Sequence, residues 1–252
     1  MNFRKVKISG INIFYREAGN CNNPAMILFH GFPSASHMFR DLMPKLENNF
    51  YLIAPDYPGF GQSDIPSRKD FNYTFDNIAE IIDAFLKTLG LEKFFIYVFD
   101  YGAPIGFRIA LKHPEKIAGI ISQNGNVYAE GLGKKWEARA EYWKNPTKEL
   151  CESYKTAFAP DTIIGQYTFG TENNSVSSDG YSLDIFYTQR PEYDEIQSDL
   201  IFDYQNNVKL YPKFQEYLRN YQPKLLAVWE KMTRLLFGQV LKLLKKTFQT
   251  QL

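Results

Sequence analysis

Cysteine and histidine are both scarce in this chain of 252 residues. Its two cysteines, Cys21 and Cys151, lie far apart, and neither they nor the three histidines show the spacing of a zinc or redox motif. A metal centre and a disulfide framework are therefore both without support, and we interpret the cysteines as ordinary thiols. We expect the protein to need no metal and no cofactor.

The sequence also lacks long apolar runs and a dominant charge. No stretch is long enough to span a bilayer, and the first residues contain no apolar core of a signal peptide. The 29 Lys and Arg against 28 Asp and Glu give a net charge of +1, without a basic stripe interleaved with aromatic residues. We therefore expect a cytoplasmic protein that binds no nucleic acid, and no membrane unless its basic C-terminal tail is genuine.

Hydrophobic residues make up 44% of the chain and aromatic residues 16%, which is enough for the core of one large domain, or of a core with an insert. Continuous apolar runs predict buried strands at 25–29, 50–54, 94–98, 117–121 and 224–229. Helices are predicted at 74–89 and 103–111, and a hairpin at 3–18. This alternation predicts an α/β fold with a doubly wound, mostly parallel sheet.

The turn after the predicted strand at 94–98 organises the chain. A strand that enters a helix through a sharp turn lifts one side chain above the sheet edge, and small residues must surround it. Here Asp100 is the lifted residue, and Gly102 and Ala103 are the small ones. A carboxylate at the end of an apolar strand is costly to bury, so this position indicates chemistry rather than packing.

A second motif follows the predicted strand at 25–29. In His30-Gly31-Phe32-Pro33, Gly31 allows a close backbone approach and Pro33 fixes the direction of the exit. The loop at 55–64 is dense in turn formers. Its glycines lack the G-x-G-x-x-G spacing of a strand–helix junction, so we assign no dinucleotide or phosphate to it.

Together the two loops and the turn at Asp100 resemble the epoxide hydrolase and haloalkane dehalogenase branch of the α/β-hydrolase superfamily, over residues 1–229. The resemblance implies that Asp100 attacks a saturated carbon to form an ester, which a water activated by a histidine then hydrolyses. It also implies that the backbone N–H groups of Phe32 and Tyr101 form an oxyanion hole. The expected partners are a small apolar substrate and water.

Two positions distinguish the branches of this family. Phe32 after His30-Gly31 looks like the epoxide hydrolase pattern, whereas many dehalogenases carry Asn there. Tyr101 stands where dehalogenases usually place a Trp that cradles the leaving halide. We therefore interpret the chain as epoxide hydrolase-like, with a haloalkane dehalogenase as the alternative.

The alternation of strands and helices stops between residues 127 and 206. This stretch is helical, rich in loops and rich in aromatic residues, as expected for a cap over an apolar pocket. We predict an α/β-hydrolase core at 1–126, a cap at 127–206 and a return to the core at 207–252. In epoxide hydrolases two cap tyrosines donate hydrogen bonds to the opening epoxide oxygen. Tyr142 and Tyr167, with His30, are our candidates for contacts with the substrate.

The resemblance also implies a histidine and a second acid that the sequence does not supply. The histidine of the family follows the last strand, but His30, His37 and His113 all lie well before that point. No triad can be completed from these residues. Two further interpretations therefore stand beside an active enzyme: a binding protein built on a hydrolase fold, and a truncated product without activity.

The C-terminal tail differs in composition from the rest of the chain. Residues 231–252 contain five Lys or Arg and no acid, whereas the other 230 residues contain 24 basic and 28 acidic ones. One interpretation is a genuine amphipathic helix that lies on a membrane or a partner. Its apolar and basic residues would lie on opposite faces: Leu236, Val240, Leu243 and Leu244 against Lys242, Lys245 and Lys246. We favour a lost nucleotide near Trp229, which removes the last strand and helix of the core.

Insertion of one base at the Trp229 codon should restore the missing acid and histidine. Methionine has the single codon ATG and every threonine codon begins with AC, so the other frame across Met232-Thr233 must encode Asp, at the end of an apolar strand. The measurement is the genomic sequence downstream, which should run past Leu252 and contain a His after a further apolar strand. An early stop, or no His, would show that the tail is genuine.

Overall fold

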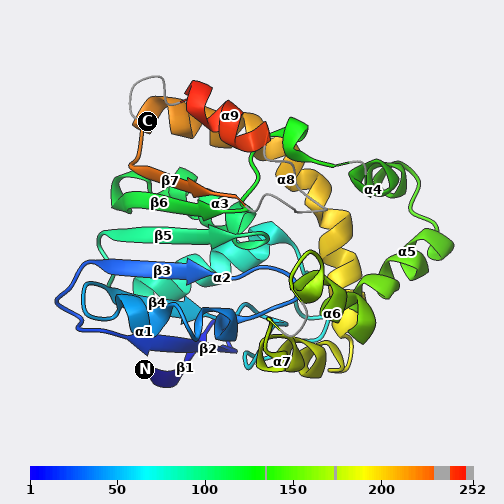
Figure 1. Ribbon diagram of the computed structural model, residues 1–252, viewed down its shortest axis with the longest axis horizontal. Helices are drawn as coiled ribbons and strands as arrows, with labels where there is room; N and C mark the ends of the chain where they lie inside the picture. Colours follow the sequence, from blue (N-terminus) through cyan, green and yellow to red (C-terminus); the bar gives the residue numbers. More distant parts are fainter. Residues whose placement is uncertain (134, 173–174, 230–238, 248–252) are drawn as a thin grey trace.

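The structure, a computed structural model shown in Figure 1, describes residues 1–133, 135–172, 175–229 and 239–247. Within these residues the chain forms one sheet, with helices packed on its faces and further helices at one end. Two parts of the sequence-based interpretation lie outside the described residues. They are the alternative frame at Met232-Thr233 and the place of Leu236 on the tail helix.

Seven strands form the sheet, in the order β1-β2-β4-β3-β5-β6-β7. Their bounds are β1 (Asn2–Ile8), β2 (Ile11–Ala18), β3 (Ala25–Phe29), β4 (Tyr51–Pro55), β5 (Phe94–Phe99), β6 (Ile117–Gln123) and β7 (Leu225–Val228). β1 and β2 form the predicted hairpin, and β2 pairs antiparallel with β4. The pairs from β4 through β3, β5 and β6 to β7 are all parallel. The prediction of a mostly parallel, doubly wound sheet is confirmed.

The strand order places the ends of β3 and β5 next to each other. From β3 the chain crosses to β4 on one side, and it later returns to β5 on the other. In such sheets, ligands bind beyond the carboxyl ends of the strands at the point where the winding reverses. The loop at His30 follows β3 and the turn at Asp100 follows β5, so both motifs lie at this point.

Nine α-helices and four short 3₁₀ helices are present among the described residues. The α-helices are α1 (Met43–Leu46), α2 (Phe75–Thr88), α3 (Gly102–Lys112), α4 (Lys135–Lys144), α5 (Lys148–Tyr154), α6 (Pro160–Thr168), α7 (Ser178–Thr188), α8 (Tyr193–Tyr221) and α9 (Gln239–Thr247). The 3₁₀ helices are η1 (Ser36–Phe39), η2 (Pro114–Lys116), η3 (Ala129–Gly131) and η4 (Lys155–Phe158). Thr74 caps α2, because its hydroxyl accepts the N–H of Asn77 at 3.1 Å.

Alternate residues of the central strands point to opposite faces of the sheet. On one face, Ile27 and Ile96 are fully buried in a core shared with α2, α3 and α8. On the other face, Met26 and Leu28 pack against Phe39 of η1. This burial on both faces is why the central strands are continuously apolar in sequence.

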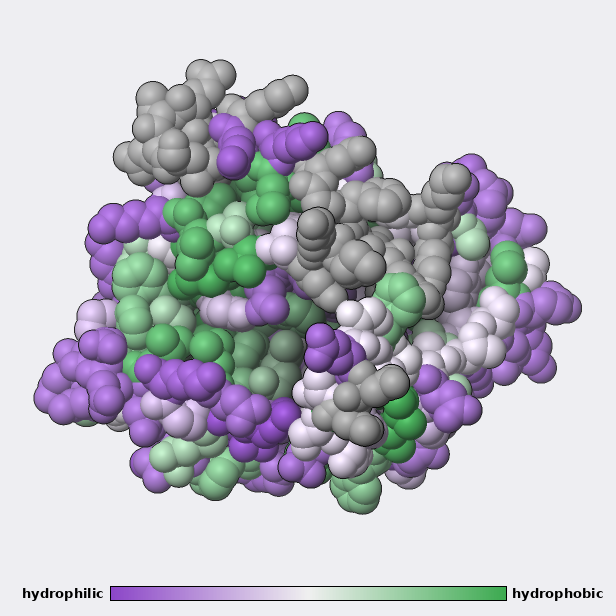
Figure 2. Space-filling view, viewed as in Figure 1, coloured by the Kyte–Doolittle hydropathy of each residue, from purple (hydrophilic) through white to green (hydrophobic). Residues whose placement is uncertain are grey.

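Among the described residues, the second face of the sheet exposes apolar side chains at its last strand. On β7, Leu226 and Val228 are 58% and 45% exposed, although Leu225 and Ala227 are partly buried on the first face. Figure 2 shows apolar side chains gathered on this face over β5, β6 and β7. Exposed apolar area of this kind is costly in water, and an edge strand that carries it is suited to pair with a further element.

Helices α4 to α7 and the N-terminal half of α8 lie beyond the carboxyl ends of the strands (Figure 1). The sequence thus predicted correctly that helices replace strands after residue 127. The proposed boundary between 206 and 207, however, falls inside α8, a continuous helix of 29 residues that contains Pro212. The cap and the core therefore share one helix rather than meeting at a loop.

The described part of the tail forms α9. Val240 and Leu244 are buried, whereas Lys242 and Lys245 are exposed, so the helix is amphipathic as predicted. Its contacts are with η3 and α8, which means that the chain itself covers the apolar face. Over the described residues, no helix combines the length and the hydrophobicity that crossing a membrane requires.

The substitution Gly102→Ala should destabilise the fold. A Cβ atom at Gly102 would lie 2.3 Å from the carbonyl oxygen of Phe29, which is backbone and cannot turn aside. We expect the free energy of unfolding, measured by urea denaturation, to fall by about 1–3 kcal/mol. Gly165→Ala in α6 is the control, because nothing lies within 4 Å of its added Cβ. It should gain about 0.5–1 kcal/mol, and equal effects of the two changes would contradict the crowding at the turn.

Candidate active site

Asp100 stands at the sharp turn between β5 and α3. Its backbone has a φ of 48°, in the left-handed region that residues other than glycine rarely adopt. The loop after β3 comes so close that a Cβ on Gly31 would lie 2.4 Å from the Cβ of Asp100. Such strain persists only where the surrounding structure enforces it, and it is common at active sites.

Two backbone amides hold the carboxylate of Asp100. The N–H of Phe32 donates to Oδ1 at 2.9 Å, and the N–H of Tyr101 donates to the same oxygen at 2.7 Å. The structure therefore brings together the three groups that the sequence selected for the nucleophile and the oxyanion hole. Their catalytic roles stay predictions.

The surroundings of Asp100 shift its pKa in opposite directions. Burial raises the pKa of Asp100, whereas the amides of Phe32 and Tyr101 and the positive charge of Arg139 on α4 lower it. Burial is the largest of these effects, so the pKa is raised overall. Asp100 keeps partial exposure to solvent. The carboxylate is thus less stabilised as an anion than one in water, as suits a nucleophile.

Aromatic side chains from α8 and the cap lie beside Asp100. The ring centre of Tyr204 is 6.1 Å from that of Tyr101 and 4.3 Å from that of Trp136. Burial raises the pKa of Tyr204 well above its ordinary value, and the charge of Asp100 contributes, so the hydroxyl stays protonated. That hydroxyl is 3.3 Å from the hydroxyl of Tyr211. The sequence did not single out Tyr204, because two tyrosines seven residues apart are equally typical of a buried helix face.

Neither of the two cap tyrosines selected from the sequence is hydrogen-bonded to Asp100 among the described residues. Tyr142 packs within the cap, with its ring centre 5.5 Å from that of Phe202. The hydroxyl of Tyr167 donates to Oδ2 of Asp184 at 2.6 Å. Tyr142 therefore contributes to the apolar packing of the cap, and Tyr167 to a buried polar cluster.

His30 is part of the core rather than a contact for the substrate. Its side chain is 0% exposed and stacks on Tyr57 with ring centres 3.9 Å apart. The Nδ1–H donates to the carbonyl of Gly31 at 3.3 Å, and Nε2 accepts the N–H of Tyr57 at 3.4 Å. Burial lowers the pKa of His30 to about 3, so the ring is neutral. With both nitrogens bound to backbone, it holds the loop after β3 in place.

The other two histidines pair with acids away from Asp100. His113 lies at the far end of α3, about 16 Å along the helix, and its Nε2 is 2.9 Å from Oδ1 of Asp83. The Nε2 of His37 is 2.8 Å from Oδ1 of Asp184. Within the part of the chain that the structure describes, no histidine is hydrogen-bonded to Asp100. None of the three histidines therefore takes the place of the base that the family uses to activate water.

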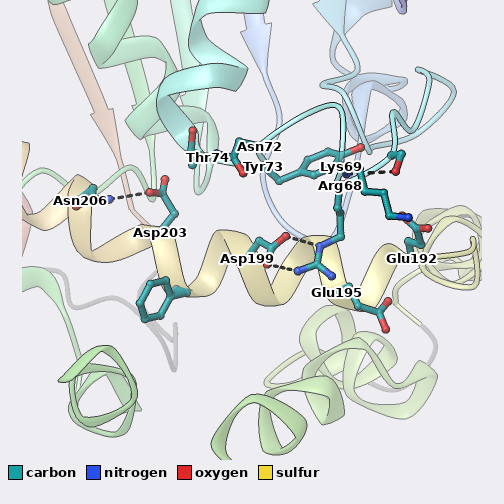
Figure 3. A pocket seen from close by; sticks show the side chains of 12 residues that line it. Arg68, Lys69, Asn72, Tyr73, Thr74, Glu192, Glu195, Asp199, Asp203 and Asn206 are labelled. Atoms are coloured by element: carbon teal, nitrogen blue, oxygen red, sulfur yellow. Dashed lines mark hydrogen bonds and ion pairs between the residues drawn. The ribbon is translucent and has the colours of Figure 1, made fainter. Parts of the chain in front are cut away.

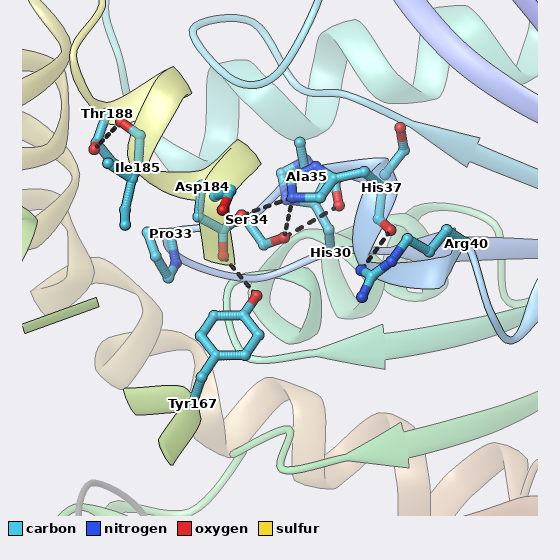
Figure 4. Close-up of polar contacts among 12 residues, drawn as sticks. His30, Pro33, Ser34, Ala35, His37, Arg40, Tyr167, Asp184, Ile185 and Thr188 are labelled. Atoms are coloured by element: carbon cyan, nitrogen blue, oxygen red, sulfur yellow. Dashed lines mark hydrogen bonds and ion pairs between the residues drawn. The ribbon is translucent and has the colours of Figure 1, made fainter. Parts of the chain in front are cut away.

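The pair of His37 and Asp184 joins the core to the cap. His37 belongs to η1 and Asp184 to α7, and their side chains are 2% and 0% exposed. The hydroxyl of Ser34 is 3.4 Å from Nε2 of His37, and Tyr167 binds the second carboxylate oxygen, as Figure 4 shows. This cluster anchors α6 and α7 on the segment that directly follows the amide of Phe32.

A groove of about 730 Å³ lies between α8 and the loop that precedes α2 (Figure 3). Arg68 forms two hydrogen bonds of 2.7 Å with Asp199 across it. Asp203 accepts the N–H of Phe75 at 2.8 Å and so caps the start of α2. Asp100 and its amide donors do not line this groove, so it is separate from the candidate active site.

The substitution Asp184→Ala should loosen the cap. It leaves His37 and Tyr167 buried without their shared partner, so we expect the free energy of unfolding to fall by about 3 kcal/mol or more. Urea denaturation measures this loss. Asp179→Ala on the exposed start of α7 is the control and should cost less than about 1 kcal/mol. Similar losses for both variants would mean that the buried pair does not anchor the cap.

The sequence of this chain is similar to those of known proteins. The profile of the alpha/beta hydrolase fold family matches residues 24–250. An uncharacterized hydrolase of Saccharomyces cerevisiae is 44% identical over 236 residues, which cover 90% of this chain and 80% of the yeast protein. A haloalkane dehalogenase of Bradyrhizobium diazoefficiens is 32% identical over 117 residues, which cover 46% of this chain and 37% of that relative.

Solved structures share the fold at low sequence identity. A loop variant of a haloalkane dehalogenase from Bradyrhizobium elkanii aligns with a TM-score of 0.77 and 18% identity, over 98% of this chain and 85% of the other. A candidate epoxide hydrolase from Pseudomonas aeruginosa aligns with a TM-score of 0.73 and 17% identity, over 92% and 80%. The family profile, the yeast relative and the fold agree: the chain belongs to the alpha/beta hydrolase fold family and is a hydrolase by descent.

Proposed function

We propose that this chain carries an epoxide hydrolase-like site in which Asp100 forms an ester with a small, mainly apolar substrate. The observation that carries the proposal is the carboxylate of Asp100 at a strained turn, with one oxygen bound by the amides of Phe32 and Tyr101. A carboxylate in this position is a nucleophile for a saturated carbon, since its ester can later be hydrolysed with the same amides stabilising the oxyanion.

Tyr204 is the proposed donor to the opening epoxide. When an oxygen of Asp100 bonds to a ring carbon, the carbon–oxygen bond of the epoxide breaks, and the freed oxygen needs a hydrogen-bond donor or a proton. Tyr204 keeps its proton, and Tyr211, 3.3 Å away, continues the hydrogen-bonded chain to Asn126. The location of Tyr204 beside Tyr101 supports this role in place of Tyr142 and Tyr167.

A haloalkane dehalogenase is the second candidate. The observation that favours it is Trp136, which is 7% exposed and whose indole N–H has no partner among the described residues. An unpaired N–H beside Tyr204 is suited to a leaving halide, and Asp100 would attack the haloalkane in the same way. The products separate the two activities, because a dehalogenase releases halide and an alcohol, and an epoxide hydrolase yields a diol.

Hydrolysis of the ester requires a base that the described residues do not provide. We infer that the restored frame after Trp229 would supply the histidine and the acid. The exposure of Leu226 and Val228 on β7, among the described residues, supports this inference because a further strand or helix would cover them. A protein that keeps the hydrolase fold, has lost the activity and only binds ligands is the remaining alternative.

Asp100 should be alkylated by a reactive epoxide and keep the adduct. Peptide mass spectrometry after incubation should locate the ester on Asp100, and Asp100→Asn should show none. The raised pKa of Asp100 sets the pH dependence, since only the carboxylate attacks. As the pH is lowered, the labelling rate should therefore begin to fall at a pH above the ordinary carboxyl pKa of about 4. Repeated turnover, or an unlabelled Asp100, would contradict the proposal.

The same labelling measured with Tyr204→Phe tests the donor. Loss of the hydroxyl should slow formation of the ester by about 100-fold, because the opening oxygen then lacks a hydrogen bond. Tyr142→Phe is the matched control and should label at the rate of the unchanged chain, since Tyr142 packs within the cap. If Tyr142→Phe slows labelling and Tyr204→Phe does not, the assignment of the donor is wrong.

A further inference from the structure

Gln197 on α8 is a buried amide without hydrogen-bond partners. Its side chain is 0% exposed, yet neither Nε2 nor Oε1 has a partner among the residues that the structure describes. Native proteins pair nearly all buried polar groups, because an unpaired one has lost its hydrogen bonds to water without replacement. A group that is left unpaired in the free protein is available to a ligand.

Gln197 faces the loop that follows β3. Residues four apart lie on one face of an α-helix, so Gln197 lies between Tyr193 and Ile201 on the same strip of α8. The hydroxyl of Tyr193 donates to the carbonyl of Pro33 at 3.3 Å. Ile201 belongs to an apolar cluster against which Phe32 packs. The strip on which Gln197 lies thus contacts Pro33 directly and shares an apolar cluster with Phe32.

These contacts connect the strip that contains Gln197 to the loop that binds the reacting carboxylate. Phe32 of that loop donates its N–H to Asp100 at 2.9 Å. Tyr204 lies two helical turns beyond Gln197 on the same side of α8, and the charge of Asp100 acts on its hydroxyl. Gln197 thus lies one turn of α8 from Ile201 and on the same side of the helix as Tyr204.

We propose that Gln197 is a specificity-determining residue that binds a neutral polar group of the substrate, one that presents a donor and an acceptor side by side as a carboxamide does. The Nε2–H donates to the carbonyl oxygen of the ligand, and Oε1 accepts its N–H. The substrate is then an apolar molecule with one carboxamide-like end, held while Asp100 attacks a carbon farther along. The proposal deepens the proposed function and rests on it for the place of reaction.

A carboxamide suits this position better than a charged group or a hydrocarbon. An apolar ligand would leave both atoms of the Gln197 amide unpaired, and a site built for hydrogen bonds discriminates strongly against analogues that lack them. A carboxylate ligand would offer two acceptors and no donor to Oε1, and it would approach the negative charge of Asp100. A neutral amide satisfies both atoms at once.

Binding of two unreactive probes tests the proposal on the full chain. Hexanamide and methyl pentyl ketone have the same size and differ only by an amino or a methyl group on the carbonyl. Titrations followed by tryptophan fluorescence and calorimetry should give about tenfold tighter binding of hexanamide. Gln197→Leu should abolish this preference and leave binding of the ketone equal or tighter.

Gln205→Leu is the matched control, because it makes the same change on a solvent-facing side of α8. It should keep the tenfold preference. Gln197→Leu should unfold at the same or a higher temperature, since an apolar side chain replaces an unpaired polar one; Gln197→Met serves as a second variant of similar size. A preference for hexanamide that survives both changes at Gln197, or no preference in the unchanged chain, would overturn the proposal.

The test separates this inference from the proposed function. Asp100→Asn should abolish labelling by an epoxide and retain the preference for hexanamide. A chain that binds hexanamide through Gln197 but cannot be labelled at Asp100 would refute the proposed reaction and uphold the binding site. A chain that is labelled but shows no preference would uphold the reaction and refute the role of Gln197.

Discussion

Two hydrogen bonds to a single oxygen of Asp100 fix the relation between loops that are far apart in sequence. The N–H of Phe32 comes from the end of β3 and that of Tyr101 from the end of β5, 68 residues and one residue away from the acid. The bonds form only because the backbones approach closely, which Gly31 and Gly102 allow. The strained φ of Asp100, the adjacency of β3 and β5 and the position of the cap all follow from this contact.

The sequence predicted the sheet and this contact well, because both depend on local signals. Continuous apolar runs mark strands buried on both faces, and the small residues around Asp100 mark the sharp turn. The cap was predicted only as a helical, aromatic segment. The predicted boundary at 206 falls inside α8, a helix that continues from Tyr193 to Tyr221.

The tyrosine beside Asp100 could not be predicted, because it depends on contacts between distant segments. Tyr204 lies against Tyr101 and Trp136 only once α8 crosses the end of the sheet. For Tyr142 and Tyr167 too, only the fold shows that one packs in the cap and the other binds Asp184. Aromatic periodicity predicts burial, not which buried hydroxyl meets a carboxylate.

The continuity of α8 limits how α4 to α7 can move relative to the sheet. The helix continues through residues 206 and 207, although Pro212 farther along donates no hydrogen bond, so the two parts cannot separate at 206 and 207 without melting the helix. The left-handed residue Glu192, with a φ of 62°, ends the connection from α7 just before α8 begins. The helix itself therefore fixes the spacing of Gln197 and Tyr204. A movement of α4 to α7 relative to the sheet would leave this spacing unchanged.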